Sequence, residues 1–472
     1  MEKYLLYING QWTGKELETF EVTNPATSEC IASVPNGGAL EAEQATDAAY
    51  EAFKTWSAYT AYERSEIIWK WHKLIDENKE ELAKMMTMEQ GKPLNEALGE
   101  ISYANGFVAW YAEEGKRIYG ETIPASVKNK RLFVQKQPVG VVAAITPWNF
   151  PAAMITRKIA PALAAGCTVV VKPAEQTPLT ALKLAQLAEQ AGFPNGVINV
   201  VTGDAQAIGQ SWLEDKRVRK LTFTGSTEVG KLLMRGAADT VKKVSLELGG
   251  HAPVIVMEDA DLEKAVNGVI ASKFRNAGQT CVCSNRIYVH ESIEQAFTSK
   301  LVEQTQQLRV GNGLEDGVDL GPLIDTAAIS KVALQIEDAV NKGAKVQTGG
   351  KLIENLYFEP TVLTNVEDNM KCMMEETFGP VAPVTTFKTE EEAITRANDS
   401  DYGLAAYVFT ENITRGIRIT EVLEYGIIGL NDGLPSVPQS PFGGFKQSGL
   451  GREGGHHGIE EFLEVKYISL GL

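Results

Sequence analysis

The residues from Phe274 to Asn285, with the sequence FRNAGQTCVCSN, place a cysteine where its thiol could react. Cys281 stands in a Gly/Gln/Thr turn between a helical pattern and a strand-like run. A cysteine that only fills a core usually stands inside an apolar run, as Cys167 does in AAGCTVVVK, because free cysteine behaves as a small hydrophobic residue. The setting of Cys281 therefore suits an exposed nucleophile, although cysteines without a chemical role are the commoner case.

A second reactive group, Glu247, ends the strand-like segment SLEL just before two glycines. An apolar setting raises the pKa of a carboxyl group and makes it usable as a general base near neutral pH. A salt-bridged carboxylate with a structural role is the alternative. The five histidines include none near Cys281 and none at ligand spacing from the C-x-C pair of Cys281 and Cys283. This argues against a Cys–His protease dyad and against a metal site.

Three loops that follow apolar, strand-like runs could hold a cofactor: Pro147–Pro151, Lys172–Glu175 and Gly225–Gly230. The last lies between a strand and a helix start, an arrangement that directs backbone N–H groups toward phosphate. A helix N-cap by Ser226 or Thr227 explains the same pattern equally well.

Lys172 and Glu175 stand three residues apart in the second of these loops. A carboxylate at this place can accept hydrogen bonds from both hydroxyls of an adenosine ribose, and it would repel a 2′-phosphate. A surface Lys–Glu pair would be the better explanation if the motif stood alone.

The order of the elements predicts the sheets that position these loops. From Val141 to Leu248, continuous apolar runs alternate with helical patterns, which indicates a parallel sheet buried on both faces and hence a doubly wound α/β domain. Such sheets bind ligands at the carboxyl ends of their strands. A second α/β series starts at Pro253, carries Cys281 and continues to about Gly444.

Two further regions complete the chain. Three helical patterns, Leu40–Trp56, Tyr62–Gln90 and Leu94–Tyr119, form an α-rich lead-in. Residues 121–140 are polar and extended, and a short excursion of this kind is marginal alone, so it should pair with another element or subunit. We expect a first domain of residues 1–120 and 141–247, a second domain of residues 248–448, and a small β oligomerisation element of residues 121–140 and 449–472.

Composition limits the partners and the compartment. The chain has 472 residues, of which 44% are hydrophobic and 22% charged, as is ordinary for a soluble globular protein. Its formal net charge of −16, without a basic block, disfavours nucleic-acid and membrane partners. Five cysteines are an odd and sparse set, unlike a disulfide framework, so we expect a cytoplasmic protein. The opening residues and the apolar segments predict neither a signal peptide nor a membrane span.

Seven motifs in series are more specific than any one of these signals. In their order and spacing, the sequence resembles the aldehyde dehydrogenase superfamily over nearly the whole chain. The motifs are TPWNFP (Thr146–Pro151), KPAEQTP (Lys172–Pro178), FTGSTEVG (Phe223–Gly230), LELGG (Leu246–Gly250), NAGQTC (Asn276–Cys281), ETFGP (Glu376–Pro380) and PFGG (Pro441–Gly444). The resemblance implies that the first domain binds NAD and that the second is catalytic.

The resemblance assigns roles to the reactive residues. In family members, the cysteine matching Cys281 attacks the aldehyde carbon, and the oxyanion is held by the side chain matching Asn149 and by the backbone N–H of that cysteine. Loss of one such donor typically costs ~10²–10³ in rate. The residue matching Glu247 is the general base for the water that hydrolyses the thioester.

The resemblance also implies a nicotinamide dinucleotide cofactor. The residues matched to its site are Lys172 and Glu175 for the adenosine ribose, Gly225 and Ser226 for the pyrophosphate, Trp148 for the cleft wall, and Glu376 and Phe378 for the nicotinamide half. Glu175 favours NAD, with NADP as the less favoured cofactor, because relatives that prefer NADP often have a small residue there.

Two segments, Met154–Lys158 and Lys273–Asn276, resemble the succinate-semialdehyde dehydrogenase branch of the family. In that branch the arginines matching Arg157 and Arg275, helped by a serine matching Ser436, bind the distal carboxylate of the substrate. Arginine–carboxylate contacts are strong and selective, and they would hold an anion against the overall negative charge. The alternative is that each arginine makes an ordinary salt bridge.

These matches predict oxidation of succinate semialdehyde by a homodimer or homotetramer. A dehydrogenase for glutarate semialdehyde or another carboxylate-bearing aldehyde is the nearest alternative, since a pocket discriminates one CH₂ by only ~1–3 kcal/mol. A CoA-acylating relative is disfavoured because those enzymes usually lack a base equivalent to Glu247. A non-catalytic, structural or redox-sensing member would be expected to have lost Cys281, Glu247 or Asn149, and all three are present.

Cys283 is a candidate for a redox switch. In some enzymes of this branch the C-x-C pair closes a disulfide that disables the nucleophile, and such a short, strained bridge is readily reduced. On this hypothesis peroxide inactivates the protein, a dithiol restores it, and Cys283→Ala loses the reversibility.

Overall fold

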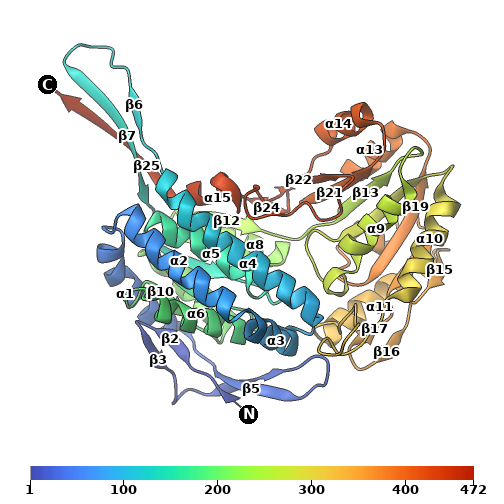
Figure 1. The fold of residues 1–472 in the computed structure, drawn as a ribbon, viewed down its shortest axis with the longest axis horizontal. Coiled ribbons are helices and arrows are strands. Elements are labelled where there is room, and N and C mark those ends of the chain that lie inside the picture. The colour runs from blue at the N-terminus through green and yellow to red at the C-terminus, as the bar shows by residue number, and fades with distance from the viewer. Residues whose placement is uncertain (1) are drawn as a thin grey trace.

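Two α/β lobes and a projecting β arm make up the computed structural model, which describes residues 2–472 (Figure 1). Met1, the first residue of the predicted first domain, lies outside the described residues. The doubly wound first domain, the second α/β domain and the small β element are those that the sequence predicts.

An eight-stranded sheet forms the centre of the first lobe, in the order β24-β12-β11-β8-β9-β10-β2-β3. The five strands from β12 to β10 are parallel, and the strands at both edges are antiparallel. The strand order reverses between β8 and β11, so the loops after these two strands border the crevice where such sheets bind ligands. The strands are β2 (Leu6–Ile8), β3 (Gln11–Thr13), β8 (Val141–Ile145), β9 (Thr168–Lys172), β10 (Ile198–Val200), β11 (Val218–Thr224), β12 (Lys243–Glu247) and β24 (Gly449–Leu450).

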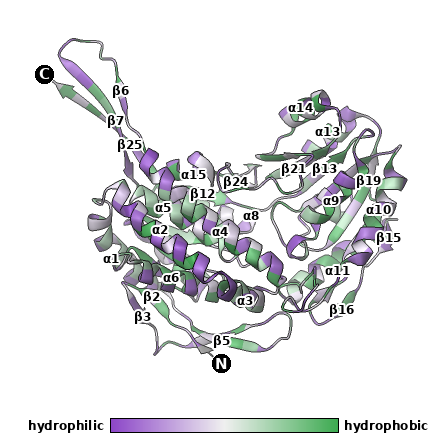
Figure 2. Cartoon of the chain, in the orientation of Figure 1, coloured by the Kyte–Doolittle hydropathy of each residue, from purple (hydrophilic) through white to green (hydrophobic). Residues whose placement is uncertain are grey.

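Helices cover both faces of this sheet. Helices α1, α7 and α8 pack on one face, α5 and α6 on the other, and α2, α3 and α4 form an outer layer over α5 and α6. In Figure 2 the outer helices carry hydrophobic residues on one side and hydrophilic residues on the other. The helices are α1 (Ala39–Trp56), α2 (Ala61–Glu77), α3 (Lys79–Gln90), α4 (Leu94–Glu114), η1 (Gly115–Arg117), α5 (Ala153–Ala165), α6 (Leu179–Ala191), α7 (Ala205–Glu214), α8 (Thr227–Ala238) and α15 (Gly455–Glu460).

The predicted helical pattern Tyr62–Gln90 is two helices. Helix α2 begins at a capping box, in which the Thr60 hydroxyl accepts a hydrogen bond from the Glu63 N–H and the Glu63 carboxylate accepts one from the Thr60 N–H. It ends at Glu77, α3 begins at Lys79, and Asn78 between them caps both helices. Periodicity missed this break because the apolar stripe continues across it. Helix α7 was not predicted.

A seven-stranded sheet in the order β15-β18-β19-β14-β13-β21-β22 forms the second lobe, and all its pairs are parallel except β15 with β18. The strands are β13 (Ala252–Val256), β14 (Ser284–His290), β15 (Lys345–Thr348), β18 (Thr361–Thr364), β19 (Val381–Phe387), β21 (Ala405–Phe409) and β22 (Ile427–Leu430). The helices are α9 (Leu262–Lys273), η2 (Arg275–Gly278), α10 (Glu294–Gln307), α11 (Thr326–Asn341), α12 (Lys371–Met374), α13 (Glu390–Asn398) and α14 (Ile413–Val422).

The arm is a three-stranded antiparallel sheet of β6 (Glu121–Ile123), β7 (Lys130–Pro138) and β25 (Leu463–Gly471) that projects from the first lobe (Figure 1). The C-terminal tail thus pairs with β7 over its whole length. Residues 449–460, which the sequence boundaries place in the arm, lie in the first lobe instead, because β24 pairs with β12 and α15 packs on α4 and α5. This pairing spans about two hundred positions of the chain, so no local pattern reveals it.

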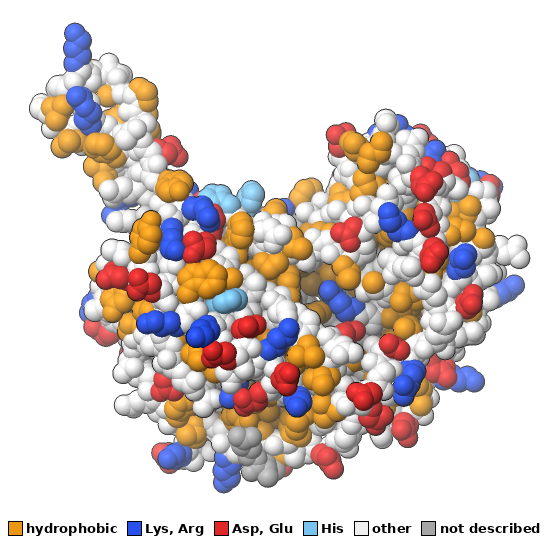
Figure 3. Space-filling view, viewed as in Figure 1, with side chains coloured by type: hydrophobic (Ala, Val, Ile, Leu, Met, Phe, Trp, Pro, Cys, Tyr) orange, Lys and Arg blue, Asp and Glu red, His pale blue; other side chains and the backbone are white. Residues whose placement is uncertain are grey.

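Smaller elements complete the molecule. An N-terminal sheet contains β1 (Glu2–Lys3), β5 (Cys30–Pro35) and β4 (Thr19–Thr23), and two-stranded ladders join β16 (Leu352–Glu354) to β17 (Tyr357–Phe358) and β20 (Tyr402–Gly403) to β23 (Phe445–Lys446). Acidic and basic side chains are interspersed over the face seen in Figure 3. Within residues 2–472, no helix is long and apolar enough to cross a membrane.

Candidate active site

A tight loop delivers Cys281 to the junction of the two lobes. After α9 the backbone turns through Asn276, Ala277 and Gly278, which have φ values of 50°, 53° and 75°. A Cβ atom at Gly278 would lie 2.1 Å from the carbonyl oxygen of Gly379, so the loop needs a glycine there. Cys281 is only 9% exposed, and the expectation of an exposed thiol was wrong because the turn faces inward. The thiol is reached through two cavities that meet at it.

Glu247, at the carboxyl end of β12, faces this thiol. The Sγ atom of Cys281 lies 3.8 Å from Oε2 of Glu247, although the two residues come from different lobes. Burial raises the pKa of Glu247 to about 7, and the nearby Arg157 opposes this rise. Burial and the Glu247 carboxylate raise the pKa of the Cys281 thiol, which favours the neutral thiol at rest.

Asn149 reaches the same place from the loop after β8. Its Nδ2 atom donates a hydrogen bond to the carbonyl oxygen of Gln279 at 3.0 Å, and its Oδ1 atom has no partner among the described residues. Because Gln279 precedes Cys281 by two residues, the amide lies beside the nucleophile. The structure thus brings the three predicted catalytic residues together from three separate segments.

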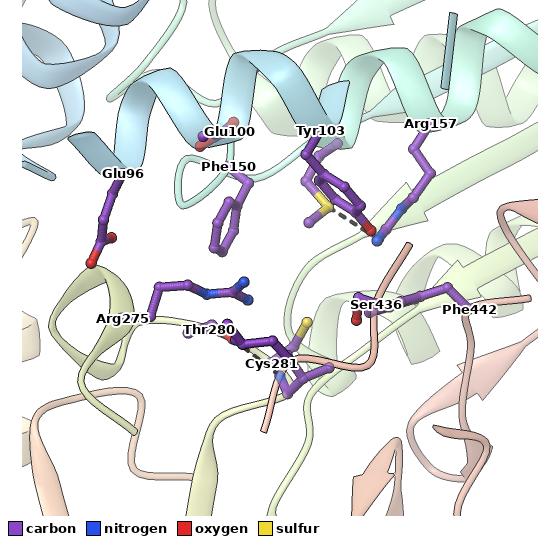
Figure 4. Close-up of a pocket in the computed structure, with 14 residues that line it drawn as sticks. Glu96, Glu100, Tyr103, Phe150, Arg157, Arg275, Thr280, Cys281, Ser436 and Phe442 are labelled. Atoms are coloured by element: carbon purple, nitrogen blue, oxygen red, sulfur yellow. Dashed lines mark hydrogen bonds between the residues drawn. The ribbon is translucent and has the colours of Figure 1, made fainter. Parts of the chain in front are cut away.

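One cavity, of about 320 Å³, opens on one side of Cys281 (Figure 4). Helix α4 contributes Glu96, Gly99, Glu100 and Tyr103, the segment of α5 and its loop contributes Phe150, Met154 and Arg157, the cysteine loop contributes Arg275, Thr280 and Val282, and the C-terminal segment contributes Leu434, Ser436 and Phe442. All three predicted substrate residues therefore line it. The α4 residues were missed by sequence reasoning, because a helix about 180 residues earlier in the chain carries no local signal that it faces this cysteine.

The two arginines of this cavity have different surroundings. Arg157 is 1% exposed, forms an ion pair with Glu453, lies 3.7 Å from Oε2 of Glu247, and has its guanidinium carbon 4.1 Å from the centroid of the Phe442 ring. The guanidinium of Arg275 extends into the cavity beside Phe150, and its Nε atom has no hydrogen-bond partner among the described residues. Arg157 is thus paired with carboxylates of the chain, whereas Arg275 forms no ion pair among the described residues.

Glu453 and Lys158 are further buried charges near Glu247 that the sequence did not single out. Glu453 forms ion pairs with both Arg157 and Lys158, and Lys158 also donates to the Thr224 hydroxyl at 2.5 Å. The two cations hold the pKa of Glu453 below its usual range, although burial opposes this. Glu453 lies in the C-terminal segment, so only the return of the chain to the first lobe brings it here.

A second cavity, of about 250 Å³, opens on the other side of Cys281, at the crevice between β8 and β11. Five of the seven predicted cofactor residues line it: Trp148, Gly225, Ser226, Glu376 and Phe378. Lys331 and Ala328 from α11 also line it and were not predicted. Lys172 and Glu175 lie outside this cavity at the end of β9, where Lys172 Nζ donates to Glu175 Oε1 at 2.5 Å.

The local geometry of this cleft fits a dinucleotide. The rings of Trp148 and Phe378 meet edge to face at 5.6 Å, and Glu376 accepts a hydrogen bond from the Gly250 N–H at 2.8 Å. A Cβ atom at Gly225 would lie 2.3 Å from the Phe223 ring, so the close approach of that ring requires a glycine here. Ser226 caps α8 by accepting from the Val229 N–H at 3.3 Å, and this bond satisfies one of the free N–H groups at the helix start.

Cys283, the redox candidate, is buried behind the loop. Both Cys281 and Cys283 are free thiols, and the Cys283 thiol donates to the Lys273 carbonyl oxygen at 3.4 Å. Its redox role stays a prediction. Among the described residues no group of histidine, cysteine or acidic side chains has the arrangement of a metal site.

Comparison with known proteins agrees with this geometry. The model of the aldehyde dehydrogenase family matches residues 12–468. The glutarate-semialdehyde dehydrogenase of Pseudomonas putida is 56% identical over 98% of this chain and 97% of its own length. The succinate-semialdehyde dehydrogenase [NADP(+)] of Escherichia coli K12 is 56% identical over the same shares of the two chains. The crystal structure of an E. coli NADP-dependent enzyme superposes with a TM-score of 0.99 at 55% identity, covering 100% of this chain and 98% of that one. The chain therefore belongs to the aldehyde dehydrogenase family.

Proposed function

We propose that the protein oxidises an aldehyde that carries a distal carboxylate, with succinate semialdehyde as the first candidate substrate. The position of Arg275 supports this most, because its guanidinium enters the cavity that Cys281 also lines. The hydroxyl of Ser436 lies in the same cavity. The names of the relatives from E. coli and P. putida point to four- and five-carbon semialdehydes, so glutarate semialdehyde is the second candidate.

The first half of the reaction follows from the position of Cys281. Its thiol gives up a proton, for which Glu247 Oε2 is the near acceptor at 3.8 Å, and its sulfur forms a bond to the aldehyde carbon. The carbonyl oxygen becomes an oxyanion, which the Asn149 amide and the Cys281 backbone N–H stabilise by hydrogen bonding. A nicotinamide dinucleotide held in the cleft of Trp148, Glu376 and Phe378 would supply a hydride acceptor. Loss of hydride from the same carbon leaves the acyl group on Cys281 as a thioester.

The second half of the reaction hydrolyses the thioester and regenerates the Cys281 thiol. Glu247 first releases to solvent the proton that it took from the thiol, and as a carboxylate it then takes a proton from a water molecule while the water oxygen attacks the thioester carbon. The carbon–sulfur bond breaks, the carboxylic acid leaves, and the sulfur of Cys281 is protonated again. A carboxyl with a pKa of about 7 is suited to this work, because it is ionised in a large fraction of molecules at neutral pH and is still basic enough to accept the proton.

The anion-binding role of Arg275 predicts a selective defect. In Arg275→Ala, kcat/KM for succinate semialdehyde should fall about 10²-fold or more, because the substrate carboxylate loses a charged partner in a largely desolvated cavity. Oxidation of butanal, which has the same carbon number and no carboxylate, should change little. Steady-state rates for both aldehydes test this, and an equal loss for both would contradict the anion-binding role.

The choice between the two semialdehydes requires kcat/KM of the wild-type protein for each. A higher value for the glutarate compound would move the assignment to the second candidate. No reduced cofactor with either aldehyde or with butanal would favour a non-catalytic member of the fold.

For the cofactor, we propose a preference for NAD. Glu175 places a carboxylate at the end of β9, with its side chain 44% exposed, where it would repel the 2′-phosphate of NADP. The name of the E. coli relative specifies NADP, so a substitution at Glu175 is needed to test the proposed preference for NAD. Glu175→Ser should raise kcat/KM for NADP by about 10-fold and lower it for NAD, because the repulsion and the ribose hydrogen bonds are lost together. An unchanged ratio of the two values would show that Glu175 does not set the preference.

We also propose that the arm joins copies of the chain. Val465, Tyr467 and Leu472 are exposed on or directly after β25, and a thin sheet of three strands buries little surface by itself. Sedimentation equilibrium measures whether the assembly is a homodimer or a homotetramer.

A further inference from the structure

An ion pair between Lys92 and Glu100 lies beside the substrate cavity, where neither residue touches the nucleophile. Lys92 stands in the loop between α3 and α4, and Glu100 is on the second turn of α4. Both side chains are 1% exposed. Burying two charges costs several kcal/mol per ion unless further hydrogen bonds satisfy them. The groups that form these further hydrogen bonds therefore show which part of the structure the pair holds in place.

Lys92 holds the backbone of Asn149. Its Nζ atom donates to the carbonyl oxygen of Asn149 at 2.8 Å and lies 4.1 Å from the centroid of the Phe150 ring. The same carbonyl oxygen accepts a second hydrogen bond, at 3.0 Å, from Nδ2 of Asn276 in the cysteine loop. The Asn149 carbonyl is therefore held from the first lobe by Lys92 and from the second by Asn276.

Glu100 holds the other end of the same short segment. Its Oε1 atom accepts hydrogen bonds from the N–H groups of Ala152 and Ala153, at 2.9 and 3.2 Å. These groups begin α5, whose N-cap residue is Ala152 and has no side-chain oxygen to supply a cap. Glu100 thus takes the place of a local N-cap, while its Oε2 atom pairs with Lys92.

The segment between these two anchors carries the oxyanion donor. Residues 149–153 lie in the second part of the loop between β8 and α5 and reach the first residue of α5, so the direction of the Asn149 side chain depends on how both ends are held. A displacement of about 1 Å at such a group can cost ~10² in rate. The ion pair contacts the backbone at the two ends of the segment and does not contact the Asn149 side chain, whose Nδ2 atom donates to Gln279 in the cysteine loop.

We propose that Lys92 and Glu100 are positioning residues for Asn149, a role that rests on the proposed aldehyde oxidation. The pair acts on kcat through the Asn149 amide. Glu100 also lines the substrate cavity, whereas neither Lys92 nor Glu100 lines the cofactor cleft. Lys92→Met, which removes the charge and keeps most of the side-chain volume, should lower kcat by about 10- to 100-fold. KM for the cofactor should stay within about 2-fold, because Lys92 does not line the cofactor cavity.

A double-mutant cycle separates positioning from general damage. If Lys92 acts through Asn149, then Lys92→Met should lower kcat in the wild-type background and have little further effect in Asn149→Ala. Multiplicative losses in the double variant would overturn the proposal. Glu100→Gln, the milder change, gives the same cycle if Lys92→Met does not fold, and Lys92→Arg should recover part of the rate.

Glu89 provides a matched control within the same fold. It is also a fully buried carboxylate that caps a helix, since it accepts hydrogen bonds from the N–H groups of Leu179 and Thr180 at 2.7 and 2.9 Å at the start of α6. Both Glu89→Gln and Glu100→Gln should lower the Tm, because both weaken a buried cap. Only Glu100→Gln should lower kcat. An equal loss of kcat in Glu89→Gln would overturn the proposal.

The crystal structure of Lys92→Met decides the question independently of turnover. A displaced 149–153 segment supports the positioning role, and an unmoved segment contradicts it. If the wild-type protein oxidises no aldehyde, the proposed function fails, whereas a normal wild-type rate with a multiplicative cycle rejects the positioning role alone.

Discussion

Cys281→Ala is expected to abolish aldehyde oxidation, with turnover reduced about 10⁴-fold or more, because the covalent route loses its nucleophile. Cys281 is the residue at which the substrate cavity and the cofactor cleft meet, and no other cysteine lines either cavity. The fold should survive, since the change removes one sulfur atom from a site that already adjoins open space. Production of reduced cofactor measures the rate, and intact mass after mixing with aldehyde shows whether an acyl group is attached.

Cys283→Ala is the control for this experiment. Cys283 is only two residues from Cys281 in the chain, but it is buried away from both cavities and contacts the Lys273 carbonyl. Its replacement should leave turnover and acylation near the wild-type level. Appreciable turnover in Cys281→Ala would show that Cys281 is not the nucleophile. Loss of acylation in Cys283→Ala alone would show the same.

Glu247→Gln is expected to separate the two halves of the reaction. Water can take the thiol proton in place of Glu247, so hydride transfer should still occur once per site, in a slower burst of reduced cofactor. Turnover after the burst should be slowed about 10²- to 10⁴-fold because the thioester lacks its base. Stopped-flow absorbance and the mass of the acylated protein measure the two phases. The absence of a burst would mean that Glu247 is needed before hydride transfer, and an unchanged steady-state rate would exclude it as the base.

The pH dependence of hydrolysis follows from the same group. The working form of Glu247 is the carboxylate, so the rate of thioester hydrolysis should be low below the pKa of about 7 and rise as the pH passes through it. Burial raises this pKa, Arg157 and Lys158 lower it, and Glu453 raises it, so three charged groups from two segments help to set the midpoint. In Glu247→Gln this inflection should disappear, whereas an inflection that persists would belong to another group.

Local patterns determined a large part of this protein in advance. Apolar runs of β8, β9 and β11 alternate with helices, so the parallel sheet and its ligand-binding edge follow from periodicity alone. The Gly/Gln/Thr segment before Cys281 predicts a turn, and the structure has a tight turn there, with φ of 50° at Asn276 and 75° at Gly278. Local sequence also places Glu247 at a strand end and Asn149 in a loop.

Tertiary structure alone decided what surrounds those residues. Glu453 reaches Arg157 and Lys158 only because the chain returns to the first lobe after the second is complete, and Lys92 reaches Asn149 only because the outer helical layer packs on α5. A pKa near 7 at Glu247 is likewise a property of its burial among these charges and not of its neighbours in sequence. The physical reason is range: turn and strand preferences act over a few residues, whereas desolvation and charge pairing depend on distance in space, which only the folded chain sets.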